Sequence, residues 1–177
     1  MANAKASIDG LNGGSTDAHH AGWFEIDSFD FDINDVIATG TGAGVGKVTF
    51  SPLTLQLSLS NGLAGVLKDT ALGTVIPSVK IEGVTGGANP VSVYDLTLGQ
   101  VQITTAHDSS GPNDSLTFNY GQVALSTKVQ NPDGSTAPGE NFSYDVAAGH
   151  IDASIPSPSV GPSIGEVPTP AKSLPAH

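Results

Sequence analysis

A glycine-rich segment that ends in Gly-Lys, Gly40–Lys47, is the first part of this sequence with the residue types for chemistry. Such segments hold phosphate groups when another glycine stands five residues before the Gly-Lys pair and a hydroxyl residue follows the lysine. Here Thr41 holds the glycine position and Val48 follows the lysine. A strand rather than a helix is expected next, so no helix N-terminus would face an anion. We therefore interpret the segment as a contact loop and not as a nucleotide site.

Histidine and aspartate side chains form a second candidate, a metal site near the N-terminus. Asp17, His19 and His20 carry suitable donor atoms, and His107 with Asp108 offers a similar pair later in the chain. Adjacent residues of an extended chain point to opposite sides, however, and structural zinc needs about four converging ligands. We favour solvated polar turns as the interpretation, with neither a metal nor a cofactor bound.

Four aspartates, Asp27, Asp30, Asp32 and Asp35, form an acidic run. Paired carboxylates can hydrolyse glycosides or bind calcium, but the glycine and the distal glutamate of a calcium loop are missing. Asp30 and Asp32 alternate with Phe29 and Phe31 along a predicted strand, so the acidic run is expected to face solvent or a lumen. A hydrolase that uses these carboxylates is the least favoured alternative, because the sequence also lacks a Gly-x-Ser-x-Gly nucleophile motif. No enzymatic activity is expected.

Trp23 and the three tyrosines are candidates for a platform on which a sugar would stack. Aromatic side chains bury large areas and dominate protein cores, so we favour the core interpretation. A secreted β-sandwich module that binds carbohydrate or protein is the main alternative function.

Charge is sparse and one-sided in this chain of 177 residues. Its 17 acidic residues are opposed by six lysines and no arginine, which gives a net charge of −11. No basic patch is available for nucleic acid, and an anionic membrane would repel the chain. The sequence has no cysteine, no recognisable signal peptide and no apolar run near the ~18 residues of a membrane helix. Charged residues make up only 13% of the chain, so few charges would need desolvation if copies packed together.

Apolar and polar residues alternate with a period of two along most of the chain, which predicts strands. A change of phase between Ile26 and Phe29 predicts a bulge, and Pro52 is expected to interrupt a later strand. The expected strands are Ser7–Leu11, Trp23–Ile33, Val48–Leu59, Val79–Val84, Val91–Thr105, Leu116–Val129 and Asn141–Val146, with a turn at Asn131–Gly134.

One helix is expected over Ser60–Leu72, capped by Ser60 or Asn61 and ended by Gly73. Long strands with a single helix predict an all-β fold, a compact β-barrel or curled double sheet with one flanking α-helix. This domain is expected to occupy residues 1–150. Six of the 12 prolines fall in residues 151–177, so this tail is expected to stay out of the sheet and to be extended or disordered.

Several segments, taken in order, resemble the Hcp (haemolysin-coregulated protein) family of bacterial type VI secretion. The resemblance covers roughly residues 6–150. Phe29-Asp-Phe31 replaces a pair of tryptophans, and the proline-rich tail has no counterpart in the short forms of the family. The segments that carry the resemblance are Ile8–His20, Phe24–Phe31, Gly46–Val48, Ser78–Glu82, Leu116–Val123, Asn131–Ser135 and Asn141–Val146.

The resemblance implies a structural protein that forms six-membered rings, which stack into the inner tube of the secretion apparatus. It also implies a sheath, a spike protein and small effector proteins as partners. The chain would be cytoplasmic before assembly and then leave the cell without a cleaved signal peptide. Within this scheme, we expect the glycine-rich loop to make the contact between stacked rings because glycine permits close approach of two backbones. The residues of this predicted contact are Gly40, Gly42, Gly44, Gly46 and Lys47.

Overall fold

The computed structural model describes residues 3–36, 47–58, 61–110, 114–151 and 153–160. Nine of its strands form one sheet in the order β11-β10-β9-β7-β6-β1-β2-β5-β8, and β8 also pairs with β7. This second pairing closes β7, β6, β1, β2, β5 and β8 into a six-stranded barrel, as the alternation predicted. The strands of this sheet are β1 (Asn3–Ile8), β2 (Phe24–Asp30), β5 (Leu53–Leu57), β6 (Ile76–Val84), β7 (Ser92–His107), β8 (Asp114–Asn119), β9 (Gln122–Gln130), β10 (Thr136–Asp145) and β11 (His150–Ile151).

The barrel closes around an apolar core to which every one of its strands contributes. In β5, Leu53, Leu55 and Leu57 are fully buried while the residues between them are not, which is the expected alternation of a one-sided strand. Phe24 and Phe118 are the largest buried side chains. Each fully buried side chain of this kind contributes about 1.5–3 kcal/mol of transfer free energy.

Strand β7 is the element that both closes the barrel and extends the sheet beyond it. Over Tyr94–Gly99 it pairs with β9, and from Gln102 to His107 it pairs with β8. The change of partner falls at Gln100, the one non-glycine residue among those described that has a positive φ, 52°. The Gly121 N–H donates to the Gly99 carbonyl at 3.0 Å, which fixes the corner where β8 ends and β9 begins.

Helix α1 (Leu63–Leu72) flanks the barrel and buries Val66. It begins after Gly62, whose φ of 83° lies in the left-handed region, and no side chain caps it. The expected cap by Ser60 or Asn61 is therefore wrong. A Cβ on Gly62 would lie 2.7 Å from the Asn12 carbonyl oxygen, so the close approach of the N-terminal loop requires glycine at this end. The predicted end at Gly73 is confirmed by its left-handed φ of 62°.

Two predicted interruptions of strands are confirmed, and a third interruption was not predicted. The register of β2 against β5 shifts between Ile26 and Ser28, at the predicted bulge. Pro52 lies between β4 (Lys47–Phe50) and β5, as expected. The predicted strand Leu116–Val129 is wrong, because the chain turns back at Tyr120 and Gly121 to form β8 and β9.

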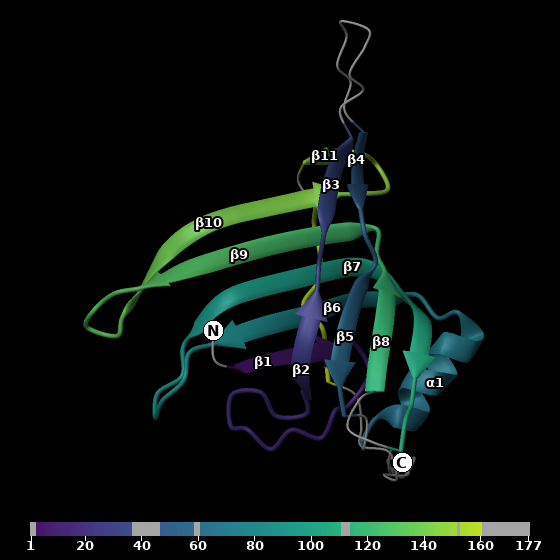
Figure 1. Ribbon diagram of the computed structural model, residues 1–177, viewed down its shortest axis with the longest axis horizontal. Coiled ribbons are helices and arrows are strands. Elements are labelled where there is room, and N and C mark those ends of the chain that lie inside the picture. The colour runs from purple at the N-terminus through teal and green to yellow at the C-terminus, as the bar shows by residue number, and fades with distance from the viewer. Residues whose placement is uncertain (1–2, 37–46, 59–60, 111–113, 152, 161–177) are drawn as a thin grey trace, which may run out of the picture.

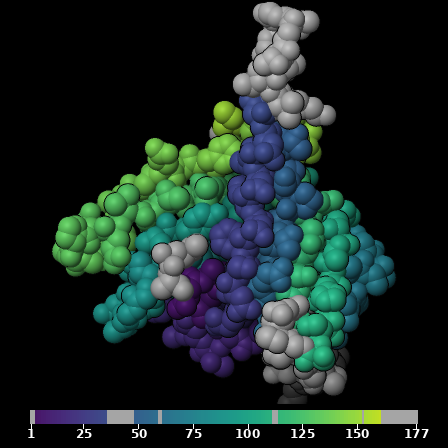
Figure 2. Space-filling model, in the orientation of Figure 1, coloured from purple at the N-terminus to yellow at the C-terminus, as the bar shows by residue number. Residues whose placement is uncertain are grey.

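Two hairpins extend away from the barrel. β9 and β10, joined by the predicted turn at Asn131–Gly134, extend to one side (Figure 1). β11 pairs with the end of β10 that is farthest from this turn, and we call these three strands the wing. β3 (Ile33–Val36) pairs only with β4, and this two-stranded hairpin rises from another side of the molecule (Figures 1 and 2). β10 begins at Thr136, five residues before its predicted start, and one bulge between Pro138 and Asn141 interrupts its pairing with β9.

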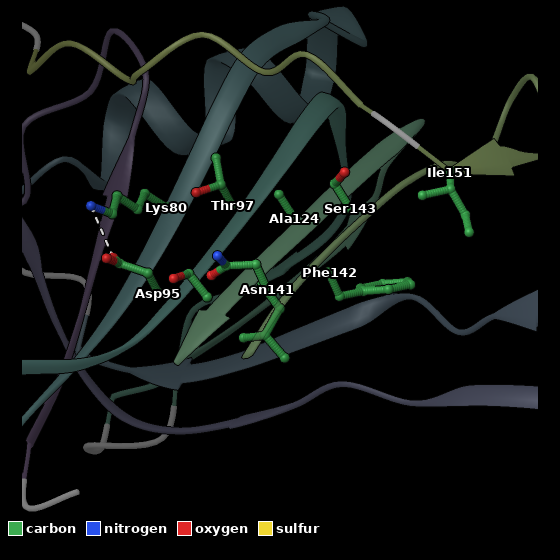
Figure 3. A pocket seen from close by; sticks show the side chains of 10 residues that line it. Lys80, Asp95, Thr97, Ala124, Asn141, Phe142, Ser143 and Ile151 are labelled. Carbon is green, nitrogen blue, oxygen red and sulfur yellow. Dashed lines mark ion pairs between the residues drawn. The ribbon is translucent and has the colours of Figure 1, made fainter. Parts of the chain in front are cut away.

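Residues 153–160, which we call the strap, leave the wing and run across the outer face of the sheet (Figure 3). The tail was expected to avoid the sheet, and this is wrong for Ile151, which pairs with Tyr144. At its far end the strap reaches the loop after β1, where the Ser159 N–H donates to Asp9 Oδ1 at 2.6 Å. The division of the chain at residue 150 stays a prediction.

A valine at position 100 should destabilise the fold, because a β-branched side chain fits the left-handed region poorly. We expect Gln100→Val to lower the free energy of unfolding by about 1–2 kcal/mol, measured by urea denaturation. Gln130→Val, at an exposed position at the end of β9, is the control and should change it by less than about 0.5 kcal/mol. Equal effects at the two positions would contradict the role of Gln100 as the strained corner.

Candidate functional site

A row of charged residues crosses the outer face of four neighbouring strands. Lys5 of β1 lies opposite Glu25 of β2 on one side and Glu82 of β6 on the other. Glu82 in turn lies opposite Asp95 of β7. Opposite charges in facing positions stabilise the pairing of neighbouring strands, and like charges oppose it. Lys5 supplies the favourable pairs, and Lys80, which lies 2.9 Å from Asp95 and 3.6 Å from Glu82, compensates the two carboxylates that face each other.

Lys5 holds the N-terminal loop against this row. Lys5 is only 7% exposed, and its ammonium lies 2.5 Å from Glu25 Oε1 and 3.0 Å from Asp17 Oδ2. Burial acts to lower the pKa of Lys5, but the hydrogen bonds to Glu25 and Asp17 outweigh it and the pKa lies above its ordinary value. The hydrogen bond from the His19 backbone N–H is the main cause that holds the pKa of Asp17 well below its usual range, and the contact with Lys5 acts in the same direction.

His20 is buried between two carboxylates, so the prediction of a solvated turn is wrong for this residue. Its Nδ1 lies 3.5 Å from Asp17 Oδ2 and its Nε2 lies 3.5 Å from Glu82 Oε2. The edge of its ring packs on Trp23 at a centroid distance of 4.8 Å. His19, the residue before it, is exposed. Glu82 is 62 positions away in the sequence, and nothing in the local pattern indicates this contact.

The other candidate ligands do not converge. Asp27, Asp30, Asp32 and Asp35 are all exposed and are spread over β2, β3 and the residues between them. His107 and Asp108 are exposed as well. Among the residues that the structure describes, no three His, Asp or Glu side chains are grouped so that they could hold a metal ion.

The tyrosines belong to a row of aromatic rings that packs against the core. Phe50 stacks on Tyr144 at 4.9 Å, and Phe29 lies 5.5 Å from Tyr94. The Tyr120 hydroxyl donates to the Ser51 carbonyl at 2.8 Å, and burial raises the pKa of Tyr120 to about 12. The predicted core role is confirmed for the three tyrosines, which are partly buried and pack against the core. Trp23 does not belong to this core and packs instead on His20.

The outer face of the sheet also carries a groove of about 630 Å³ where β6, β7, β9 and β10 lie side by side (Figure 3). Lys80 lies on its floor and is ion-paired with Asp95 at 2.9 Å and with Glu82 at 3.6 Å. Burial acts to lower the pKa of Lys80, and the contacts with Asp95 and Glu82 outweigh it, so the pKa is raised. Phe142 and Ile151 form an apolar rim at the β10 end, and both are exposed.

The wing ends in an edge strand. Among the strands that the structure describes, β10 has β9 on one side and on the other only β11, which pairs with Tyr144 and Asp145 alone. Edge backbone groups without partners can pair with another chain. Val129 on β9 is 58% exposed, and Phe142 on β10 is 37% exposed. The wing therefore combines open backbone groups with exposed apolar side chains, which suits association with another chain.

The predicted ring-stacking residues lie largely outside the described residues. Gly40, Gly42, Gly44 and Gly46 fall in the gap between residues 36 and 47, and Lys47 is the first residue of β4. The structure thus places the two strands that flank this loop and leaves its contacts as a prediction.

A family described as "Type VI secretion system effector, Hcp" matches residues 6–126 of this sequence. The chain belongs to the Hcp family. As an Hcp protein it is a type VI secretion tube protein, and this family consists of structural tube proteins that self-assemble and are secreted.

Solved structures agree with this assignment at the level of the fold. A structure titled "Structure of a type six secretion system protein" has a TM-score of 0.77 at 16% identity and covers 85% of this chain and 99% of its own. Hcp1 from Salmonella typhimurium has a TM-score of 0.69 at 21% identity and covers 85% of this chain and 98% of its own. Secreted protein Hcp3 from Pseudomonas aeruginosa has a TM-score of 0.60 at 15% identity, with 80% and 98% coverage. No curated protein matches the chain.

Within the described part of this Hcp chain, no helix is long and apolar enough to cross a membrane. The row of aromatic rings includes Phe31, which occupies one of the positions where the resemblance expected a tryptophan and lies 6.3 Å from Tyr120. A smaller ring at this position still packs against the core, so the substitution is compatible with the barrel.

Acid should release the N-terminal loop only at low pH. Because the folded pKa of Asp17 is depressed, its ionisation stabilises the fold fully above the unfolded value near ~4 and this contribution is lost as the pH falls below it. Trp23, the single tryptophan, contacts His20 in this loop and reports its state by fluorescence. We expect the Trp23 emission to change as the pH falls below about 4.

Asp17→Asn should show the emission of the loosened loop already at neutral pH, since the ion pair with Lys5 is lost. Asp27→Asn removes an exposed aspartate of the same charge and is the matched control. Emission of Asp17→Asn that equals the emission of Asp27→Asn at neutral pH would contradict the assignment to Asp17.

Proposed function

We propose that this chain forms six-membered rings that stack into the inner tube of a type VI secretion apparatus and that the lumen carries small effector proteins. The subunits would be made in the cytoplasm and leave the cell with the tube, without a cleaved signal peptide. A sheath and a spike protein are the further partners that this function requires. The observation that carries the proposal is the wing, an open sheet edge with exposed apolar side chains on a barrel of the Hcp family.

The ring contact is assigned to the wing. In a closed ring, one face of each subunit contacts a different face of the next. The edge of the wing occurs once in each subunit and is therefore suited to one side of this contact. A durable interface of this kind needs on the order of 2,000 Å². The bulge at Pro138–Asn141 and the Glu140 side chain blunt part of the edge and oppose irregular strand addition.

Stacking of rings is assigned to the loop between β3 and β4. These strands rise away from the barrel (Figure 1), and in the sequence they flank the glycine-rich segment. Ile33 and Val48, which are 43% and 40% exposed, provide apolar area on this hairpin that a second ring would cover.

A charge on the wing should dissociate the rings. Val129→Lys places an ammonium in the proposed contact, where it must be desolvated without a partner, and we expect the apparent dissociation constant between subunits to rise at least ~10-fold. Leu72→Lys, at an apolar residue of α1 that is 69% exposed, is the matched control and should leave rings intact. Negative-stain microscopy and sedimentation distinguish rings from subunits. Rings that persist in Val129→Lys but are lost in Leu72→Lys would contradict the assignment to the wing.

Deletion of the glycine-rich loop should separate ring formation from stacking. We expect a chain without Gly40–Gly46 to form rings of normal diameter and no tubes, because the wing is untouched. Replacement of the same residues by an equal number of serines keeps the loop length and tests whether the glycines themselves are needed. Intact tubes in the deletion variant would refute the stacking role of Gly40, Gly42, Gly44 and Gly46.

A further inference from the structure

The floor of the groove on the outer face of the sheet is made of small side chains at two levels of neighbouring strands. At one level, Thr97 of β7 faces Ala124 of β9, which in turn faces Ser143 of β10. At the next level, Ser126 of β9 faces Asn141 of β10. Residues two apart on a strand lie about 7 Å apart and point to the same side. The two levels therefore form one continuous floor that crosses the strands (Figure 3).

This floor carries hydrogen-bonding groups that the protein itself does not use. Within the described part of the chain, the hydroxyls of Thr97 and Ser126 and the amide of Asn141 have no hydrogen-bond partner. The first two residues are half-buried and Asn141 is exposed, so water reaches all three groups. Hydroxyl and amide groups both donate and accept, which matches the N–H and C=O groups of a peptide backbone.

The strap forms one wall of the groove and shows what kind of chain this face binds. A cavity of about 210 Å³ beneath the strap shares part of its lining with the groove, so the two are continuous. Ile155 lies over Gly99, where a Cβ would be 3.1 Å from the isoleucine methyl group. Ala153 and Ile155 are half-buried, whereas Ser154 and Pro156 are exposed. The strap is thus an extended, uncharged segment that places alternate side chains on the sheet.

The remaining walls of the groove define the chemistry of a second segment beside the strap. For the backbone groups of residues 154–158, the described residues provide no hydrogen-bond partner. Phe142 and Ile151, which are 37% and 67% exposed, supply apolar surface at the β10 end. At the β6 end, Lys80 is paired with Asp95 at 2.9 Å. A chain in the groove would therefore contact open hydrogen-bonding groups and an apolar rim, with little unpaired charge.

We propose that the groove binds an extended, uncharged segment of a partner protein, which lies beside the strap and places an apolar side chain against Phe142 and Ile151. β6 and β10 are three strand spacings apart, about 14 Å, a distance that four or five extended residues span. A charged segment would lose its hydration here without gaining a free counter-charge. The groove is complete within one subunit, so this inference goes beyond the proposed ring and does not depend on it.

Synthetic peptides test the proposal on the full chain. The probes are the hexapeptide Leu-Ser-Ala-Ser-Ala-Ser and its reverse sequence, which covers the opposite direction, both with blocked ends that carry no charge. We expect saturable binding of at least one probe by calorimetry, with a dissociation constant that changes less than about twofold between low and high salt. Ser126→Phe fills the floor away from the strap and should weaken binding at least ~10-fold. Ser115→Phe, at a half-buried serine of β8, is the matched control and should leave the binding unchanged.

The position of the bound probe is tested by photo-leucine in place of its leucine, and we expect cross-links to Phe142 or Ile151. Asn141→Ala, a truncation at an exposed position, should weaken binding about threefold and serves as a second variant in case Ser126→Phe disturbs the sheet. Absence of saturable binding, equal affinity of both variants and the unmodified chain, or cross-links confined to other elements would overturn the proposal. Sedimentation of the same samples tests the ring separately. Single subunits that bind the probe in the groove refute the proposed ring alone, whereas rings that bind no probe refute the groove alone.

Discussion

The change of partner along β7 is the constraint on which the rest of this structure depends. One half of this 16-residue strand closes the barrel through β8, and the other half carries β9 and with it the wing. The two functions meet at Gln100, where the backbone takes a conformation that costs energy for a residue with a side chain. Without this corner the chain would form either a closed barrel with no edge to offer or an open sheet with no enclosed core. A barrel with one open wing is the form that permits stable subunits to associate through a limited part of their surface.

Charge limits how these subunits associate. Each chain carries a net charge of −11, and two of its six lysines, Lys5 and Lys80, are held between carboxylates of the same chain. Copies of the chain therefore repel one another at long range and must be held by apolar and backbone contacts at short range. The exposed side chains of Val129 and Phe142 and the open edge of β10 supply contacts of this kind. The pairing of Lys80 with Asp95 also means that the groove beside the wing presents little uncompensated charge to a partner.

Features that change the residue pattern at one place in the sequence could be predicted from it. The phase shift at Ile26, the interruption at Pro52 and the glycine that ends α1 each change the pattern of residues at the place where the structure changes. The family, too, could be recognised from short segments in order. The hairpin at Tyr120 and Gly121 was missed although the apolar alternation changes phase there, from Leu116, Phe118 and Tyr120 to Val123 and Leu125. The burial of His20 and the course of the strap were missed because Glu82, Gly99 and Asp9 supply contacts that no local pattern reveals.

Association of this chain with itself, with no bond-making chemistry, is the central claim, and the native mass in solution tests it most directly. Sedimentation of the purified chain over a wide range of concentration at physiological salt should give one closed species with six times the mass of a single subunit. A chain that remains a single subunit at the highest concentration, and at raised salt that screens its charge, would contradict the account.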